Sequence, residues 1–147
     1  MQTTLKEVQL VEKIIKNDVV KEKTIKNLYK HIFKSNGKKI RSKLNLIASS
    51  VNRKKKNRIK LAAIIELLHT ATLVHDDVVD DSSFRRGKES VNKLWSNAHG
   101  VLIGDYIYSK AFMYMVDIGN QEILNELSRA TNDISQGELI QLDACLL

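Results

Sequence analysis

An acidic stretch followed by two arginines, HDDVVDDSSFRR, has the clearest capacity for chemistry in this sequence. At about 100° per residue, Asp76 and Asp80 lie one turn apart on the same helix face, and His69 lies on that face about two turns earlier. Asp77 falls to the side, and Asp81 enters the following loop. Like charges at this spacing, at the negative end of a helix, destabilise it, so a compensating cation is expected.

A hard divalent cation is the expected compensator. Mg²⁺ binds one or two carboxylates and completes its shell with water and phosphate oxygens, and a carboxylate pair without Cys or His ligands suits Mg²⁺ better than Zn²⁺. Arg85 and Arg86 follow at once, and arginine binds phosphate in a bidentate manner. The stretch therefore predicts a magnesium site at Asp76 and Asp80 for a polyanion such as diphosphate. The alternative is an acidic helix end that is simply hydrated.

A second cluster of charge is basic. The segment NGKKIRSK, residues 36–43, places Lys38 and Arg41 three residues apart after a glycine, where a helix is expected to start. An anion there would also meet the free N–H groups of the helix N-terminus. Together with Arg86 and His69, these residues could form a second diphosphate pocket, although a hydrated basic helix start is the alternative. His75 falls on another face and is interpreted as structural.

Apolar residues at helical spacing predict an all-α protein. The sequence contains no proline, shows no strand alternation and has no internal repeat. Two glycines in the segment 98–118 predict close packing against a neighbouring helix, and residues 52–57 and 81–90 are expected to be loops. The expected helical segments are residues 3–20, 24–34, 38–51, 58–80, 91–95, 98–118 and 120–147.

Length and cysteine content bound the class of protein. The 147 residues suffice for one domain with a real core. The single cysteine, Cys145, rules out an intramolecular disulfide and fits a reducing compartment. No segment resembles a signal peptide, and no apolar run is long enough for a membrane span. A cytoplasmic protein that does not span a membrane is therefore expected.

Charge is distributed unevenly along the chain. Residues 1–60 carry eighteen Lys and Arg against four acids, whereas residues 61–147 carry six against thirteen. A basic half can indicate nucleic acid, or simply lysines on hydrated helix faces. Tyr29 and Phe33 are the only aromatic residues of the basic half, which is few for stacking on bases. No nucleic-acid partner is therefore expected.

Taken together, these motifs resemble those of the trans-polyprenyl diphosphate synthases. HDDVVDDSSFRRGK resembles the family's first aspartate-rich motif, and NGKKIRS resembles its basic motif. SNAHGVLIGDYIYSKAF and ISQGELIQL are similar to two further family segments, and ELLHTATLVHDDVVD is particularly like the octaprenyl, long-chain branch that makes quinone side chains. The resemblance covers residues 36–142.

The resemblance implies a fold, a reaction and a set of site residues. The fold is an antiparallel helix bundle of the isoprenoid synthase type around a deep apolar cavity, in a homodimer. The reaction condenses isopentenyl diphosphate head-to-tail with an allylic diphosphate, with Mg²⁺ as cofactor. The residues implied to hold Mg²⁺ are Asp76, Asp77 and Asp80, with Arg85 contacting the allylic diphosphate. Those implied to bind isopentenyl diphosphate are Lys38, Arg41, His69 and Arg86.

Product length and completeness are also implied by the resemblance. Ala71 and Thr72 occupy positions that limit product length in the family, and both are small, which implies a long product. The basic motif departs from the family pattern at Asn36, Lys39 and Ser42, where Gly, Arg and Pro are usual. Nothing matches the second aspartate-rich motif. We therefore expect a single synthase domain over residues 1–147, truncated to its N-terminal helices. The alternative function is a non-catalytic remnant that binds magnesium diphosphate or associates with an intact synthase.

Overall fold

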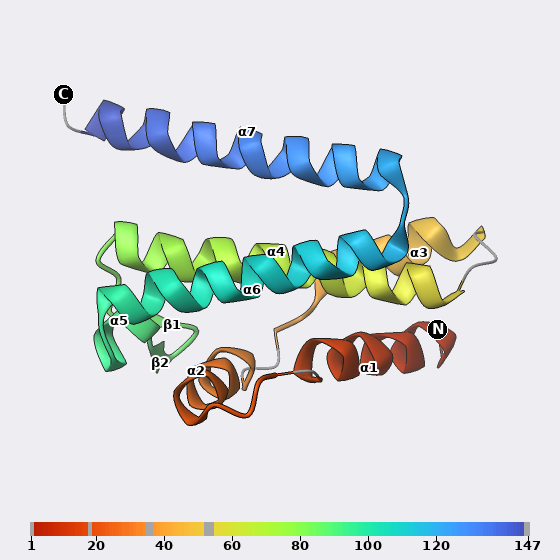
Figure 1. Ribbon diagram of the computed structural model, residues 1–147, viewed down its shortest axis with the longest axis horizontal. Coiled ribbons are helices and arrows are strands. Elements are labelled where there is room, and N and C mark those ends of the chain that lie inside the picture. The colour runs from red at the N-terminus through yellow and green to blue at the C-terminus, as the bar shows by residue number, and fades with distance from the viewer. Residues whose placement is uncertain (1, 18, 35–36, 52–54, 146–147) are drawn as a thin grey trace.

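The computed structural model describes residues 2–17, 19–34, 37–51 and 55–145. Seven α-helices, one 3₁₀ turn and one small hairpin are found in these residues, which confirms the predicted all-α class. The elements, in chain order (Figure 1), are α1 (Gln2–Lys16), α2 (Lys23–Phe33), α3 (Ile40–Ala48), η1 (Ser49–Val51), α4 (Lys55–Val79), β1 (Phe84–Arg85), β2 (Lys88–Glu89), α5 (Val91–Leu94), α6 (Asn97–Ile118) and α7 (Gln121–Cys145).

The centre of the molecule is the antiparallel pair formed by α4 and α6. Figure 1 shows α1 and α2 below this pair and α7 above it, while α3 packs beside α4. The core lies where these helices meet, because each turns its apolar stripe toward the pair. The largest fully buried apolar side chains are Val11, Ile15, Leu46, Ile64, Leu67, Ile107 and Met115.

Two glycines allow α4 and α6 to approach closely. A Cβ atom at Gly104 would lie 2.2 Å from Nε2 of His75, and one at Gly100 would lie 2.5 Å from Cγ2 of Val78. The His75 ring fills the space over Gly104, where Nε2 lies 3.1 Å from the carbonyl oxygen of Val101. The close packing predicted from the glycines of this segment is therefore confirmed, and the structural interpretation of His75 agrees with its place between the two helices.

The first helix is shorter than predicted. It was expected to reach residue 20 but ends at Lys16. The carbonyl oxygen of Ile15 would accept the amide of residue 19 in a continued helix, but it accepts a hydrogen bond from the hydroxyl of Tyr29 on α2 at 2.6 Å. The end of α1 therefore coincides with a contact to another helix, which apolar spacing within α1 does not reveal.

The segment expected to be a loop, residues 81–90, contains the hairpin. Phe84 pairs with Glu89 and Arg85 pairs with Lys88. The two connecting residues, Arg86 and Gly87, have φ angles of 52° and 76°. Positive φ at both central positions is the geometry of the tight turns that match strand twist. Asn36 of the basic motif and residues 52–54 of the other expected loop lie outside the described residues.

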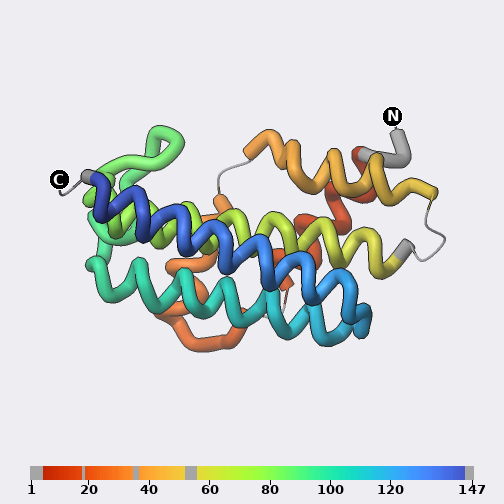
Figure 2. The backbone as a smooth tube through the Cα atoms, turned by 90° about the horizontal axis from the view of Figure 1, so that it is seen from above, coloured from red at the N-terminus to blue at the C-terminus, as the bar shows by residue number. Residues whose placement is uncertain are grey.

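Helix α7 is attached to the bundle only near its start. Leu124 and Leu127 pack against the core, but residues 132–144 are all exposed. Figures 1 and 2 agree in placing α7 over the α4–α6 layer, along both helices. None of the described helices combines the length and the apolarity that crossing a bilayer requires.

Candidate active site

The two consecutive aspartates at the end of α4 face different surroundings. Asp76 is half-buried and lines an open groove between α4, α6 and α7. The Asp77 side chain is only 5% exposed and pairs with Arg85 of the hairpin. Nε of Arg85 donates to Oδ1 of Asp77 at 2.8 Å, and Nη2 lies 2.8 Å from the same oxygen. Asp77 therefore anchors the hairpin, while Asp76 remains available to the groove.

The groove has a volume of about 830 Å³ and is acidic at one end. Its lining residues include Asp76 from α4, Asp105, Tyr108 and Phe112 from α6, and Glu138 from α7. Burial and the negative charge of Glu138 raise the pKa of Asp76, which means that the ionised carboxylate is disfavoured there. A cation bound at this end would relieve that cost.

Asp80 follows Asp76 by one helical turn, as the spacing in the sequence predicts. The amide of Asp80 donates to the carbonyl oxygen of Asp76 at 2.8 Å, so the helical turn continues one residue past the end of α4. The negative charge of Asp80 contributes to the raised pKa of Asp76. Within the described part of the chain, no three His, Cys, Asp or Glu side chains are already grouped to hold an ion. Two carboxylates do fit Mg²⁺, because this ion takes its other ligands from water and phosphate.

Around His69, the structure brings together basic residues that are distant in sequence. Burial lowers the pKa of His69, and the charges of Arg41, Arg86 and Arg85 lower it further, against an opposing effect of Glu66. These arginines come from α3 and from the hairpin, so both segments lie near enough to His69 for their charges to act on it. His69 was expected on the face of the aspartates, but the charges that act on it are those of the arginines and Glu66.

A glycine makes room for one of these arginines. A Cβ atom at Gly37 would lie 2.5 Å from Nη1 of Arg86, so the guanidinium occupies the space that the glycine leaves open. Both residues line a small pocket of about 90 Å³, which also contains Asp77 and Arg85. Lys38 is exposed.

The sequence did not point to Glu66, which organises the start of α3. Its Oε1 atom accepts hydrogen bonds from both the backbone N–H of Ser42, at 3.1 Å, and the Ser42 hydroxyl, at 2.6 Å. Ser42 stands where the family motif usually has proline, which lacks an N–H donor. Glu66 thus accepts both of the hydrogen-bond donors that Ser42 has and that a proline at this position would lack. The only signal in the sequence was a single acid inside the apolar part of α4.

A second departure in this motif, Lys39, is also paired. Nζ of Lys39 lies 3.3 Å from Oε1 of Glu12 on α1. Lys39 has a φ angle of 46° and precedes the first residue of α3. Its side chain therefore connects the basic segment to α1 instead of extending the basic cluster.

The two positions implied to control product length differ in their surroundings. Thr72 lines the groove one turn before Asp76, whereas Ala71 is completely buried. A larger residue at position 72 would narrow the groove directly. The role of both residues in product length stays a prediction.

The comparisons with known proteins agree with the motifs. The family model described as polyprenyl synthetase matches residues 22–146. The chain is 43% identical over 122 residues to an all-trans-nonaprenyl-diphosphate synthase of Rhodobacter capsulatus and 43% identical over 119 residues to an octaprenyl diphosphate synthase of Escherichia coli. These alignments cover 82% and 80% of this chain. The chain belongs to the polyprenyl synthetase family.

Solved structures show the same fold. A decaprenyl diphosphate synthase from Rhodobacter capsulatus superposes with a TM-score of 0.90 at 37% identity, covering 97% of this chain and 45% of that one. A Caulobacter crescentus polyprenyl synthase complexed with calcium and isoprenyl diphosphate gives a TM-score of 0.89 at 34% identity, covering 96% of this chain and 44% of that one. The two sequence relatives are covered over 38% and 37% of their length. The chain thus spans less than half the length of these relatives.

Proposed function

We propose that this chain carries the diphosphate-binding helices of a prenyltransferase that condenses isopentenyl diphosphate head-to-tail with an allylic diphosphate. One observation carries the proposal most strongly. The end of α4 and the hairpin after it combine an acidic groove at Asp76 with a basic cluster around His69. An enzyme that joins two diphosphates needs a binding site for each of them. The acidic groove would bind one through a metal cation, and the basic cluster would bind the other through its own positive charges.

In this proposal, Asp76 and Asp80 would hold magnesium at the end of the groove. The ion would supply charge neutralisation for the diphosphate leaving group. Asp77 completes the predicted metal set, but its carboxylate is engaged by Arg85, so we assign it the role of positioning that arginine. The Arg85 side chain is about a third exposed, and it would contact the allylic diphosphate from that exposed side.

The second diphosphate is assigned to the basic cluster. Arg41, Arg86 and Lys38 provide positive charge for isopentenyl diphosphate, and all three are exposed. His69 has a lowered pKa and is neutral near pH 7, so it would bind the anion as a hydrogen-bond donor. Of these residues, Arg86 also lines the small pocket beside Gly37.

The walls of the groove suit a carbocation and a long prenyl chain. Tyr108 and Phe112 face it from α6, and aromatic rings both exclude water and stabilise positive charge. Burial raises the pKa of Tyr108, so its hydroxyl stays protonated and is a poor nucleophile. Ala71 and Thr72 are small and would leave room for a long chain, so we propose an octaprenyl-like product for quinone side chains. A cytoplasmic homodimer remains part of the proposal.

A second candidate function is binding without turnover. The chain spans less than half of its relatives, and the part of α7 that borders the groove exposes Ile134 and Leu139 at 46% and 64%. Exposed apolar residues beside a groove indicate a surface that is normally covered. In this candidate, the chain binds magnesium diphosphate or associates with an intact synthase.

A product assay separates the two candidates. Purified chain is incubated with labelled isopentenyl diphosphate, farnesyl diphosphate and Mg²⁺, and labelled lipid is extracted with an organic solvent. Labelled polyprenyl product that disappears in Asp76→Ala supports the prenyltransferase. Magnesium-dependent binding of diphosphate without any product supports the second candidate, and the absence of both contradicts the two proposals.

A further inference from the structure

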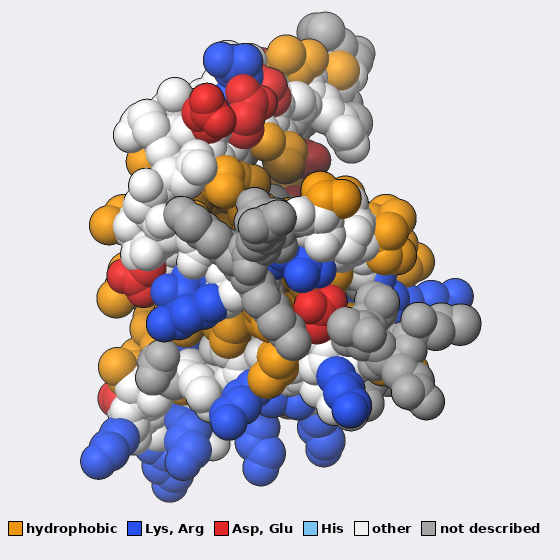
Figure 3. Space-filling view, turned by 90° about the vertical axis from the view of Figure 1, so that its right-hand side faces the viewer, with side chains coloured by type: hydrophobic (Ala, Val, Ile, Leu, Met, Phe, Trp, Pro, Cys, Tyr) orange, Lys and Arg blue, Asp and Glu red, His pale blue; other side chains and the backbone are white. Residues whose placement is uncertain are grey.

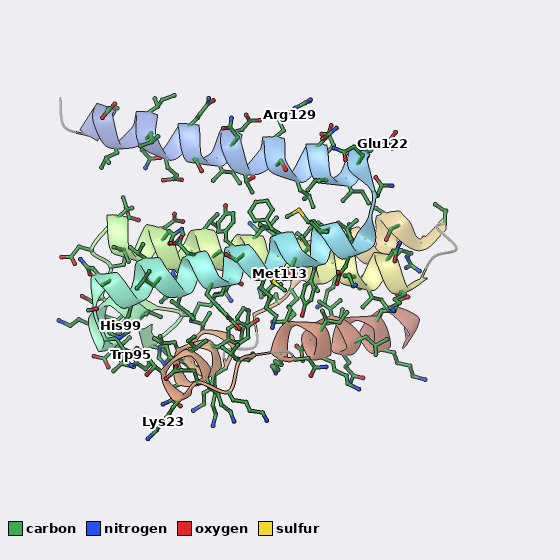
Figure 4. The ribbon with its side chains drawn as sticks, in the orientation of Figure 1. Lys23, Trp95, His99, Met113, Glu122 and Arg129 are labelled. Carbon is green, nitrogen blue, oxygen red and sulfur yellow. The ribbon has the colours of Figure 1, made fainter. Side chains whose placement is uncertain are left out.

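The outer face of α2 is a stripe of lysines. At about 100° per residue, Lys23, Lys26, Lys30 and Lys34 fall within one narrow sector of the helix, and all four are exposed. Figure 4 shows Lys23 pointing away from the bundle, and Figure 3 shows blue side chains along the lower edge of the molecule, where Figure 1 places α1 and α2. Lys16, at the end of α1, is also exposed. The stripe is therefore a concentrated positive surface.

The described acids of the same two helices and their connection do not neutralise this surface. Glu7 is buried and lies 3.4 Å from Nη1 of Arg58. Glu12 pairs with Lys39, and Glu22 accepts a hydrogen bond from the amide of Ile25 at 2.8 Å. Glu7 and Glu12 are thus engaged elsewhere, whereas Glu22 stays exposed and charged at the N-terminus of α2. This single acid offsets only part of the positive charge of the lysines around it.

The lysines surround an apolar hollow. A cavity of about 430 Å³ is lined by Val19, Tyr29 and Phe33 together with Lys16, Lys26, Lys30 and Lys34. The Tyr29 and Phe33 ring centroids are 4.5 Å apart, and the Tyr29 hydroxyl donates inward to the carbonyl oxygen of Ile15. Tyr29 is almost fully buried, so the accessible floor is formed mainly by Val19 and Phe33. The rim presents ammonium groups on long apolar stems.

We propose that this lysine face docks on a bilayer that contains anionic phospholipids. Lipid phosphates would meet the rim, and the upper part of an acyl chain would meet the floor. The apolar side of α2 is packed into the core through Leu28 and Tyr29, so the helix does not insert. The attachment is peripheral and electrostatic, and it weakens as salt is added.

Nucleic acid fits the same face less well. Proteins that bind single strands place aromatic rings on the surface for bases to stack on. Here Tyr29 is buried, and Phe33 is only half-exposed.

The groove at Asp76 lies on the other side of the α4–α6 pair (Figure 1), so docking of the lysine face on a membrane leaves the groove open. The inference is therefore independent of the proposed function.

Vesicle flotation tests the inference with the whole chain. Wild-type protein is mixed with vesicles of phosphatidylcholine alone or with about a third phosphatidylserine, at low and at physiological salt. We expect binding only to the anionic vesicles, falling as salt rises. Each stripe lysine contributes about fivefold in partitioning, so Lys26→Gln combined with Lys30→Gln should weaken binding by about twenty-five-fold.

A matched variant controls for net charge. Lys56→Gln combined with Lys93→Gln removes the same charge from exposed positions outside the stripe, and it should change binding by less than about threefold. Unchanged circular dichroism shows that both variants fold. Equal loss in the two variants, or no binding of wild-type protein to anionic vesicles, overturns the inference. So does tight binding to single-stranded RNA that competes with the vesicles and excludes them.

Discussion

Adjacent aspartates with different partners should respond in opposite ways to the same substitution. Asp77 makes contacts of 2.8 Å and 2.9 Å with Nε of Arg85 and one of 2.8 Å with Nη2, and its side chain is 5% exposed. Breaking a buried pair costs about 3–5 kcal/mol. Because the Arg85 side chain is 35% exposed, it can regain water. Burial raises the pKa of Asp77, which offsets part of what the pair gains, while the contacts with Arg85 oppose that shift. Because Asp77→Asn leaves the guanidinium without its charged partner, we expect it to lower the free energy of unfolding by about 2 kcal/mol.

Asp76→Asn should have the opposite sign. The pKa of Asp76 is raised in the folded state, so the folded state holds its proton more tightly than the unfolded chain does. The resulting penalty is fully present above the raised pKa and disappears as the pH falls through it. At pH 7, Asp76→Asn removes an ionised carboxylate beside Glu138, and stability should stay equal or rise by up to about 0.5 kcal/mol.

Thermal unfolding followed by circular dichroism measures both changes. For a chain of this size, 2 kcal/mol corresponds to a fall in Tm of about 4–8 °C. The advantage of Asp76→Asn should vanish when the measurement is repeated in acid, below the ordinary aspartate pKa. An Asp77→Asn protein as stable as wild type would refute the anchoring role of Asp77. A loss of about 2 kcal/mol or more in Asp76→Asn would refute its placement in the groove.

Three further predictions concern the packing and the basic cluster. Gly104→Ala places a methyl group 2.2 Å from an imidazole nitrogen of α4 and should lower Tm, whereas Gly137→Ala, with nothing within 4 Å of its Cβ, should not; differential scanning calorimetry compares them. Ser42→Ala removes the hydroxyl donor to Glu66 and should cost about 1–2 kcal/mol in urea unfolding; no loss argues against that contact. His69 should titrate below its ordinary pKa in NMR spectra and shift upward with pyrophosphate; no shift contradicts an anion site there.

The helical arrangement could be predicted because apolar spacing and glycine placement are local properties of the sequence. The long helix that ends at the aspartates and the close packing of α6 both follow from such signals. The length of α1 could not, because the carbonyl oxygen of Ile15, which a longer helix would need, is bonded by Tyr29 of another helix. The hairpin was missed because Arg86 is an unusual residue to adopt positive φ, and only Gly87 signalled a turn.

The site could be predicted in its residue types but not in its grouping. Helical spacing placed Asp80 one turn from Asp76, and the structure keeps that turn. The same spacing put His69 on the face of Asp76, yet the charges that act on His69 are those of the arginines and Glu66. Glu138 reaches the groove from α7. This charge lies 62 residues after Asp76 in the chain, so no local pattern around Asp76 could reveal it.

Calorimetric titration with inorganic pyrophosphate tests the central claim most directly. The account predicts that Mg²⁺ adds pyrophosphate binding to that of the basic cluster, and that Asp76→Asn abolishes this magnesium-dependent part. Asp133→Asn removes the same charge from an exposed position of α7 and should bind as wild type does. Equal binding with and without Mg²⁺, or undiminished binding by Asp76→Asn, would contradict a metal-assisted diphosphate site at the end of the groove.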